Sequence, residues 1–394
     1  MVARPLRVGI DVTPLLPQPT GVDRYMTELV AAFGRLTAEA DFTLFANRED
    51  RDRFGGLPPR FNVSFVGSRN RVARLAIQQT CLPGLCAARG IDVLHSPSFL
   101  MPWFRGHTRH VVTVHDMTFF TLPQVHTRLR RSGTFTRMVL ASIRRASSIV
   151  VPSATVRDEL LARVPATDAG RVRVTPYGVS ARFGTDGALD ASRLAGLPWL
   201  PRAPFVLSVA TLEPRKNLPV LIEAFRRLVR AGLDLHLVLV GGAGEAREAI
   251  EAAISSAGLT SRVHLPGFIP DDNLAALYRS ARVFAFPSLA EGFGFPPLEA
   301  MASGLPVVAS TGSALAENLR GAAVLVAPDD PGNVADAIHA MVSDDAARAR
   351  AIAAGLERAS RFTWDETARL TFDCYRAAAL TSTDRLTVPA ISTD

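Results

Sequence analysis

Short apolar runs rich in valine, isoleucine and leucine alternate with longer amphipathic stretches through both halves of the chain. A run that is apolar at successive positions predicts a strand covered on both faces, as in a parallel sheet. In the first half the predicted strands lie at 6–12, 41–46, 61–67, 91–96, 110–116, 147–153 and 171–176. In the second half they lie at 205–212, 235–242, 262–268, 282–288, 306–310 and 322–328.

Helical patterns lie between several of these strands, for example at 21–36 and 127–146. The alternation of strand and helix predicts two doubly wound α/β domains, one over 1–180 and one over 181–365. The stretch 178–204 is rich in Gly, Pro and Ala, which predicts a linker between them. Ligands of open parallel sheets bind outside the carboxyl ends of the strands, so we expect the site where two such domains face one another.

The size and composition of the chain fit a folded protein of two domains. It has 394 residues, of which 48% are apolar and 21% charged, and single cores rarely grow beyond about 250–300 residues. No stretch approaches the ~18 consecutive apolar residues that predict a membrane-spanning helix, and we see no signal peptide. The three cysteines lack metal-ligand spacing, which is typical of reduced thiols in the cytoplasm.

The formal net charge of +7 favours an anionic partner such as nucleic acid, a phosphorylated substrate or acidic lipid. The alternative is that this charge only reflects an arginine-rich composition and has no functional meaning. The arginines are spread along the chain and are not interleaved with aromatic residues, so nucleic acid is the least favoured partner.

The segment TLEPRKN, residues 211–217, contains the only lysine of the chain. Arg215 and Lys216 follow a predicted strand and precede a predicted helix, which places them at a carboxyl edge of the second domain. Two adjacent cations there suit a diphosphate, which arginine binds as a fork and lysine as a point charge. The alternative is a solvated helix start, although cations at that end oppose the helix dipole.

The segment EGFGFPPLEA, residues 291–300, also follows a predicted strand. Its glycines free the backbone, its prolines suit the first turn of a helix, and its amides can cradle phosphate or sugar oxygens. These amides belong to Gly292, Phe293, Gly294 and Phe295. Glu291 and Glu299 lie on either side of the loop. Because a carboxylate would repel a diphosphate, we expect both to bind neutral hydroxyl groups.

Two patterns in the first half also mark strand ends. In LPQPTGVDRY, Gly21 opens a predicted helix, whose amides can approach an anion; an ordinary turn glycine fits equally well. His115 and Asp116 end the strand predicted at 110–116. The imidazole can bond to a sugar hydroxyl or act as a base, or the pair is structural.

Together these segments resemble the retaining glycosyltransferases of the GT-B fold, family 4 in the usual classification. TLEPRKN resembles the Arg-Lys diphosphate site of that family, and EGFGFPPLEA resembles its paired-glutamate motif. TPYGV, residues 175–179, is similar to its interdomain segment, and QPTGVDRY stands in for its glycine-rich N-terminal loop. In that loop Thr20 occupies a position where a second glycine is common.

The resemblance covers residues 6–380 and implies two Rossmann-like domains that face each other across a cleft. The segment 362–378 is similar to the terminal helix of the family, which returns to the first domain. Residues 366–394 are therefore expected to form that helix and a tail.

The resemblance also implies roles for residues of the second domain. Arg215 and Lys216 would bind the diphosphate of the donor and stabilise it as the leaving group. Glu299 would hold the ribose hydroxyls. Glu291, with the amides of the loop that follows it, would position the transferred sugar.

In the first domain, Thr20 and Gly21 would approach the diphosphate, and His115 would contact the sugar near the reacting carbon. In this family the acceptor attacks from the face that the diphosphate leaves, without a metal or other cofactor. EDRDRF places Asp50 and Asp52 at the spacing of metal-binding aspartates of other glycosyltransferases. We interpret this run as a solvated loop.

The segments VHD (114–116) and TLEPRKN resemble those of bacterial mannosyl- and rhamnosyltransferases. This resemblance favours GDP-mannose as the donor, with a UDP- or dTDP-sugar as the alternative. The acceptor is expected to be a saccharide or a lipid-linked saccharide. A basic amphipathic helix predicted over 127–147 suits peripheral contact with an acidic membrane, or is simply a solvated helix face. Nucleic acid is not expected as a partner.

Three other functions are alternatives. A NAD-dependent enzyme is disfavoured because VGGAGEAR has Arg247 where the dinucleotide fingerprint needs its third glycine. A sugar-nucleotide epimerase of the same fold would need no acceptor. A catalytically inactive sugar- or nucleotide-binding protein would release no nucleotide at all.

Overall fold

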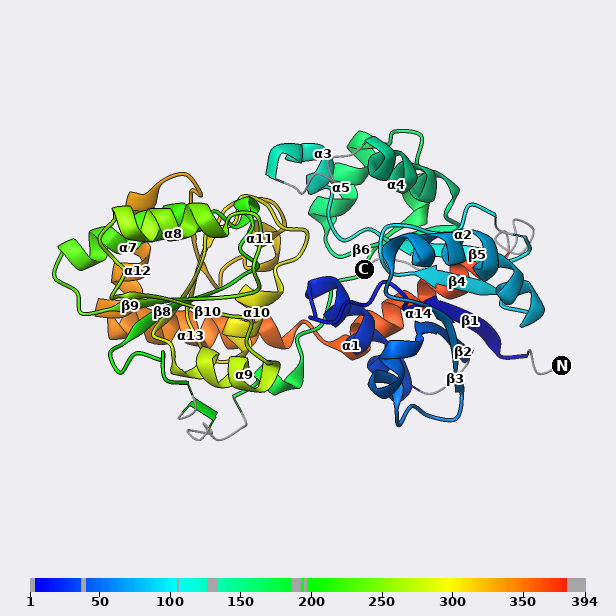
Figure 1. Cartoon of the computed structure of the whole chain (residues 1–394), viewed down its shortest axis with the longest axis horizontal. Coiled ribbons are helices and arrows are strands. Elements are labelled where there is room, and N and C mark those ends of the chain that lie inside the picture. Colours follow the sequence, from blue (N-terminus) through cyan, green and yellow to red (C-terminus); the bar gives the residue numbers. More distant parts are fainter. Residues whose placement is uncertain are drawn as a thin grey trace, which may run out of the picture. The chain divides into compact units, whose positions relative to one another are not determined.

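The computed structural model describes residues 4–36, 40–104, 106–125, 133–185, 193–194 and 197–380. The chain divides into two units (Figure 1). Unit 1 contains the described residues up to His115, those of Gly133–Tyr177, and those from Trp364 onward. Unit 2 contains those that follow His115 as far as residue 125, and those of Gly178–Thr363.

The sheet of unit 1 has seven strands in the order β3-β2-β1-β4-β5-β6-β7, with parallel pairings throughout. The strands are β1 (Leu6–Asp11), β2 (Ala40–Asn47), β3 (Phe61–Gly67), β4 (Val93–Ser96), β5 (Arg109–Thr113), β6 (Ser148–Val151) and β7 (Val172–Val174). The strand order reverses at β1, which lies between β2 and β4. In open α/β sheets such a reversal is where ligands bind.

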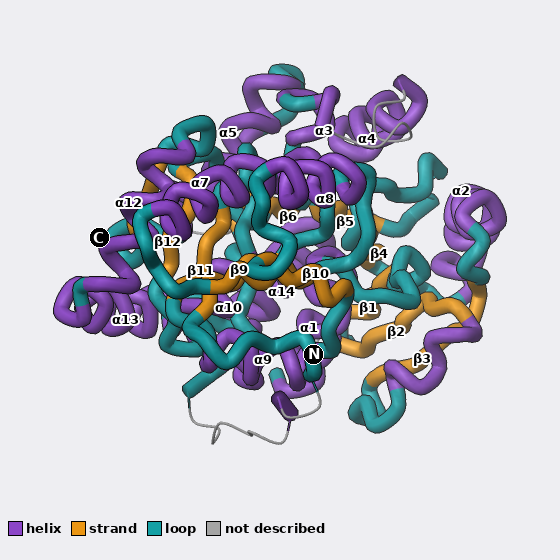
Figure 2. The backbone as a smooth tube through the Cα atoms, turned by 60° about the vertical axis from the view of Figure 1, so that its left-hand side comes forward, coloured by secondary structure: helices purple, strands orange, loops and turns teal. Residues whose placement is uncertain are grey.

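Helices pack on this sheet (Figure 2). They are α1 (Gly21–Arg35), α2 (Arg71–Ala88), α4 (Gly133–Arg145), α5 (Ala154–Arg163) and α14 (Trp364–Ala379). The last of them, α14, packs against α1, β4, β5 and β6. This confirms that the C-terminal helix returns to the N-terminal domain. The basic helix predicted over 127–147 corresponds to α4, but residues 126–132 lie outside the described part of the chain, so its contact with a membrane stays a prediction.

The sheet of unit 2 has six parallel strands in the order β10-β9-β8-β11-β12-β13. The strands are β8 (Phe205–Val209), β9 (His236–Val240), β10 (Val263–Gly267), β11 (Val283–Phe286), β12 (Val307–Ser310) and β13 (Val324–Val326). The helices of unit 2 are α3 (Thr118–Thr121), α7 (Leu218–Arg230), α8 (Arg247–Ser256), α9 (Asp271–Ser280), α10 (Phe295–Ala302), α11 (Ala314–Asn318), α12 (Pro331–Ser343) and α13 (Asp345–Ser360). The order reverses at β8, between β9 and β11.

Two doubly wound parallel sheets confirm the predicted fold class, and each predicted strand range overlaps a strand. β5 and β8 each end three residues sooner than predicted, at Thr113 and Val209. In both places the chain leaves the sheet to form a loop, and these loops carry His115 and Arg215. No helix among the described residues has both the length and the hydropathy needed to cross a membrane.

Candidate active site

Arg215 and Lys216 lie in the connection between β8 and α7, at the carboxyl end of β8. They belong to a short 3-10 helix, Pro214–Lys216, which ends at Asn217 in a left-handed conformation with φ 54°. The Asn217 amide group donates to the carbonyl oxygens of Pro287, at 3.2 Å, and Pro328, at 2.6 Å. These bonds attach the cationic segment to the loops that follow β11 and β13.

Glycines of the loop after β9 allow it to lie directly against the same segment. A Cβ atom at Gly241 would be 1.9 Å from the carbonyl oxygen of Ala210, and one at Gly244 would be 2.3 Å from that of Leu212. No side chain fits at either position. The glycines of VGGAGEAR therefore have a packing role, which explains their resemblance to a dinucleotide fingerprint without dinucleotide binding.

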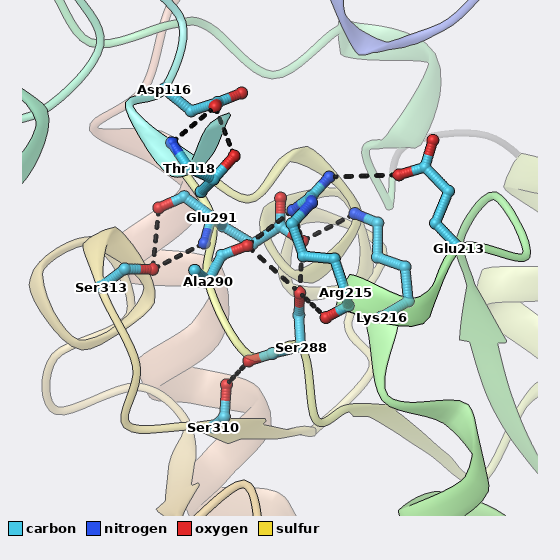
Figure 3. Close-up of polar contacts among 10 residues, drawn as sticks. All are labelled: Asp116, Thr118, Glu213, Arg215, Lys216, Ser288, Ala290, Glu291, Ser310 and Ser313. Atoms are coloured by element: carbon cyan, nitrogen blue, oxygen red, sulfur yellow. Dashed lines mark hydrogen bonds and ion pairs between the residues drawn. The ribbon is translucent and has the colours of Figure 1, made fainter. Parts of the chain in front are cut away.

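One carboxylate oxygen holds the centre of the site together (Figure 3). Glu291 Oε1 lies 2.6 Å from Lys216 Nζ and 2.7 Å from Arg215 Nη1. Only 11 to 13% of these three side chains is exposed. The ammonium group also lies 5.0 Å from the ring centroid of Phe286, at the end of β11, which adds a cation–π contact. Residues 75 positions apart in the chain thus form a single charged cluster.

The charges of this cluster control one another's protonation. Burial favours the neutral form of Glu291, but the charges and hydrogen bonds of Arg215 and Lys216 outweigh it and hold its pKa at about 2. Burial and the charge of Arg215 lower the pKa of Lys216, against the opposing effect of Glu291. Burial also opposes the charge of Arg215, yet Glu291 and then Asp116 raise its pKa. At neutral pH Glu291 is therefore an ionised carboxylate beside the Arg215 guanidinium.

Three serines complete the site, and sequence reasoning missed all of them. Ser288 Oγ donates to Glu291 Oε1 at 2.6 Å. Ser313 Oγ accepts from the Glu291 N–H at 2.6 Å and donates to the Glu291 carbonyl oxygen at 2.8 Å. Ser310 donates to the carbonyl oxygen of Ser288. The only local signal was that Ser288 and Ser310 are the last residues of predicted strands, as many structural serines are.

Ser313 adopts an unusual backbone conformation to make these bonds. Its φ of 53° and ψ of −141° are rare for a residue with a side chain and imply local strain. Such strain persists where surrounding bonds require it. Here the two hydrogen bonds to Glu291 stabilise the Ser313 conformation, and they hold the backbone of Glu291 in place.

The loop after Glu291 is shaped by its second glycine. Gly294 has φ 95°, and a Cβ atom there would meet the Leu315 side chain at 2.6 Å. Phe293 is buried and packs its ring against those of Phe295 and Phe362. Gly292 is buried beside them. Contact of the loop amides with a ligand stays a prediction.

Glu299 lies on α10, in a different environment from Glu291. Only 1% of the residue is exposed, and its Oε2 accepts a hydrogen bond of 3.0 Å from the Tyr278 hydroxyl. To hold ribose hydroxyls it would have to give up or share this bond. Its predicted role in the donor site therefore stays untested.

His115 has partners on both ring nitrogens. Nε2 lies 2.7 Å from the carbonyl oxygen of Pro97, and Nδ1 lies 2.7 Å from the Tyr177 hydroxyl. A carbonyl oxygen only accepts, so Nε2 carries a proton and donates to Pro97. Rings of Tyr25 and Phe99 pack against the imidazole. A sugar contact would require His115 to exchange one of these bonds, and its catalytic role stays a prediction.

Thr20 and Gly21 lie exposed at the start of α1. The Asp23 carboxylate accepts from the backbone N–H of Thr20 at 2.8 Å and from that of Leu16 at 2.6 Å. A negative charge thus already occupies this helix end, which weakens its attraction for a diphosphate. The sequence contained this signal, because an acid three residues after a threonine predicts a capping box.

The interpretation of EDRDRF as a solvated loop is wrong for Asp50. The run forms a 3-10 helix, Arg48–Phe54, in which Asp50 is fully buried. Its Oδ1 lies 2.9 Å from Arg69 Nη2 and 3.4 Å from Arg53 Nε. The arginines neutralise the carboxylate, so burial is tolerated. In the part of the chain that the structure describes, no three His, Cys, Asp or Glu residues are grouped so that they could hold a metal ion.

Comparison with known proteins places these features in a family. Residues 19–183 match the model described as Glycosyltransferase Family 4, and residues 196–358 match the one described as Glycosyl transferases group 1. The chain is 29% identical over 285 residues to the O-antigen chain mannosyltransferase B of Escherichia coli, an alignment covering 72% of this chain and 74% of that protein.

Two further similarities differ in extent. The chain is 32% identical over 243 residues to the serotype-specific mannosyltransferase WbdA of Escherichia coli, which covers 59% of this chain and 29% of that protein. The crystal structure of Anabaena HepE in complex with UDP and glucose matches with a TM-score of 0.75 at 19% identity, over 94% of this chain and 100% of that one. At that identity the likeness shows the fold alone.

The two Rossmann-like units have the fold of the GT-B glycosyltransferases. The chain belongs to the group 1 glycosyltransferases of family 4 and is similar to mannosyltransferases. It is therefore a glycosyltransferase.

Proposed function

We propose that this protein transfers a hexose, with mannose favoured, from a nucleotide diphosphate sugar to a glycan or lipid-linked saccharide with retention of anomeric configuration. The observation that carries the proposal is the cluster in which Arg215 and Lys216 both bind Glu291 Oε1. It lies at the carboxyl ends of β8 and β11, where nucleotides bind in sheets of this kind.

The charges of the cluster match the charges that develop during transfer. Breaking the bond between the anomeric carbon and the diphosphate leaves negative charge on the phosphate and positive charge on the sugar. Arg215 and Lys216 are fixed cations that stabilise the leaving phosphate more strongly in the transition state than in the ground state. The acceptor then attacks from the same face, and the leaving phosphate takes its proton.

Glu291 would orient the sugar. The hydrogen bonds and ion pairs described for its side chain all involve Oε1, and 11% of the side chain is exposed. Its second oxygen, Oε2, is therefore suited to accept a hydrogen bond from a sugar hydroxyl. A neutral hydroxyl fits this place, whereas a phosphate would be repelled by the ionised carboxylate.

The names of relatives support the donor and pathway. Mannosyltransferases among the curated relatives favour GDP-mannose and a role in cell-surface polysaccharide or glycolipid synthesis. The HepE crystal structure is a complex with UDP and glucose, which makes a UDP-sugar the alternative. We propose a cytoplasmic location, since nucleotide sugars are the co-substrates and the three cysteines form no disulfide.

The test is to incubate the protein with GDP-, UDP- and dTDP-sugars, with and without acceptor saccharides. Free nucleotide that appears only with an acceptor supports transfer, and NMR of the product reports whether the configuration is retained. An epimerised free donor would instead identify an epimerase. If no donor is consumed under any condition, the protein is a binding protein and the proposal fails. Turnover is expected to survive chelation with EDTA, because no step above needs a metal.

A further inference from the structure

Two histidines of unit 2 contact each other across neighbouring strands. His236 is the first residue of β9, and His264 is the second residue of β10. His236 Nδ1 lies 2.8 Å from His264 Nε2. The ring planes are inclined by only 24°, and the ring centroids are 5.1 Å apart. Among the described residues, neither imidazole forms another hydrogen bond or an ion pair.

The sheet fixes this arrangement. His264 pairs with Val238 in the parallel register of β10 with β9. Side chains at alternate positions of a strand point to the same face of a sheet, so His236, Val238 and His264 share one face. Both histidines are half-buried, so solvent reaches part of each residue. The backbone therefore holds two ring nitrogens close together where a dissolved ion can approach them.

The histidine pair lies away from the donor site. The two histidines stand at the amino ends of β9 and β10, whereas Arg215 follows the carboxyl end of β8. In a parallel sheet these ends form opposite edges, separated by the length of the strands. A ligand of the pair would therefore be distinct from the nucleotide sugar.

Both imidazoles are neutral at neutral pH. Burial lowers the pKa of His236, and the charge of Arg262 lowers it further, against the opposing effect of Asp234. Burial and the neighbouring His236 lower the pKa of His264. A neutral imidazole has a lone pair on one of its nitrogens, and this is the form that binds metal ions.

We propose that His236 Nδ1 and His264 Nε2 together bind a divalent transition-metal ion, with Zn²⁺ as the first candidate. Imidazole is a preferred ligand of Zn²⁺, Cu²⁺ and Ni²⁺. Zn–N bonds of about 2.0–2.1 Å place two neighbouring ligand nitrogens roughly 2.9–3.4 Å apart. The facing nitrogens, now at 2.8 Å, would have to separate by only a few tenths of an ångström. The proton between them would move to the other nitrogen of its own ring, so binding releases no net proton.

The site would have two protein ligands, with water completing the coordination. In the described part of the chain no group of three His, Cys, Asp or Glu residues could hold a metal ion. Structural zinc sites have four protein ligands. Binding by the histidine pair is therefore expected to be weaker than at such a site and readily reversed by EDTA.

A bound ion would fasten the edge of the sheet. β10 is the last strand on its side and lies beside β9 (Figure 2). The register of the two strands shifts between His264 and Gly267, so their regular pairing is short. An ion held by His236 and His264 would join the strands just before this shift. Because the unfolded chain does not hold the two rings together, the ion would stabilise the folded state.

Charges beside the pair give a further expectation. Arg262 Nη1 lies 2.8 Å from Asp234 Oδ1, and both charges act on His236. The guanidinium repels a bound cation, whereas the carboxylate attracts it. R262Q is therefore expected to bind Zn²⁺ several-fold more tightly than the wild type, and D234N several-fold more weakly.

The test is isothermal titration calorimetry of the full chain, without an affinity tag and after removal of metals with EDTA, with ZnCl₂ and then NiCl₂. H236Q and H264Q are each expected to lower the affinity by roughly tenfold or more, since even changes beyond the ligands of a metal cost about 10- to 100-fold. H339Q is the matched control. His339 is exposed on α12 and lies outside the pair, so this variant should bind as the wild type does.

A second measurement locates the ion without any substitution. Zn²⁺ is expected to slow amide hydrogen exchange of the wild-type chain in β9 and β10, and to raise its melting temperature by a few degrees. Thermal unfolding of the metal-free variants shows whether each of them is folded.

Three outcomes would overturn the proposal. They are wild-type affinity in both H236Q and H264Q, no binding at millimolar Zn²⁺, and slower exchange only in segments other than β9 and β10. The contact between the two rings would then be a hydrogen bond alone.

The metal site goes beyond the proposed function and fails separately from it. H236Q and H264Q are expected to transfer sugar at the wild-type rate. A chain that binds Zn²⁺ at the pair but consumes no donor contradicts only the proposed function. A chain that transfers sugar but binds no metal contradicts only the metal site.

Discussion

The Lys216 ammonium group lies 2.6 Å from Glu291 Oε1, and the Arg215 guanidinium reaches the same oxygen at 2.7 Å. Both cations follow β8, and the carboxylate that neutralises part of their charge follows β11. Removing one partner from such a buried cluster leaves the others with an uncompensated charge, which commonly costs about 3–5 kcal/mol.

Lys216→Ala is expected to weaken nucleotide binding and to lower kcat by about 100- to 1000-fold, because one fixed cation no longer stabilises the leaving phosphate. Thermal-shift titration with GDP, UDP and dTDP, followed by turnover assays, measures both effects. Lys216→Arg keeps the charge and should recover part of the activity. If Lys216→Ala turns over as fast as the wild type, Lys216 does not stabilise the leaving diphosphate.

Ser288→Ala is expected to lower kcat about tenfold with little change in the KM for the donor. The hydroxyl acts through Glu291, whose Oε1 it contacts at 2.6 Å, so its loss misplaces the carboxylate without removing a cation. Ser288→Thr retains the hydroxyl and should restore kcat. Ser310→Ala is the control, because Ser310 donates to the Ser288 carbonyl oxygen and not to Glu291. Equal effects of both alanine variants on kcat would indicate a purely structural role.

Stability is expected to fall as the pH drops below about 6.5, because the buried His95 stays neutral in the folded state. Burial, and the nearby charge of His115, lower the pKa of His95 to about 3. A group whose pKa is lower in the folded state stabilises the fold above its unfolded pKa and loses that effect as the pH falls. Each such group contributes a slope of about 1.4 kcal/mol per pH unit.

Urea unfolding at several pH values between 7 and 4.5 measures this slope. His95→Gln should make the decline shallower by about one proton, whereas substitution of the exposed His339 should not. An unchanged slope in His95→Gln would show that His95 does not titrate on unfolding. The pKa of Glu291, at about 2, adds stability that is lost only when the pH falls from about 4.5 toward 2.

Tyr375→Phe is expected to destabilise unit 1 by about 1–3 kcal/mol, because it leaves a buried nitrogen without its partner. The Tyr375 hydroxyl lies 2.7 Å from His95 Nδ1 and links α14 to β4. The melting temperature should fall by several degrees. Arg369→Gln, on an exposed face of the same helix, should change it little. If both variants melt alike, the hydroxyl does not anchor α14.

The strands and their order along the chain could be predicted from the sequence, because strands that are buried on both faces need unbroken apolar runs. The same logic placed Arg215 at the end of β8 and Glu291 beyond the end of β11. The capping role of Asp23 was also encoded locally, by its spacing from Thr20. All of these depend on neighbours within a few residues.

Other features of the site depend on which strand ends meet. Ser288 and Ser313 look like ordinary loop serines until the fold brings them to Glu291, and Asp50 looks solvated until Arg69, far along the chain, closes over it. His115 looks available until Tyr177 and Pro97 occupy its nitrogens. Local sequence patterns encode burial and turn geometry. The hydrogen bonds and ion pairs of the site join residues that are far apart in the sequence, and only the tertiary structure shows which of them meet.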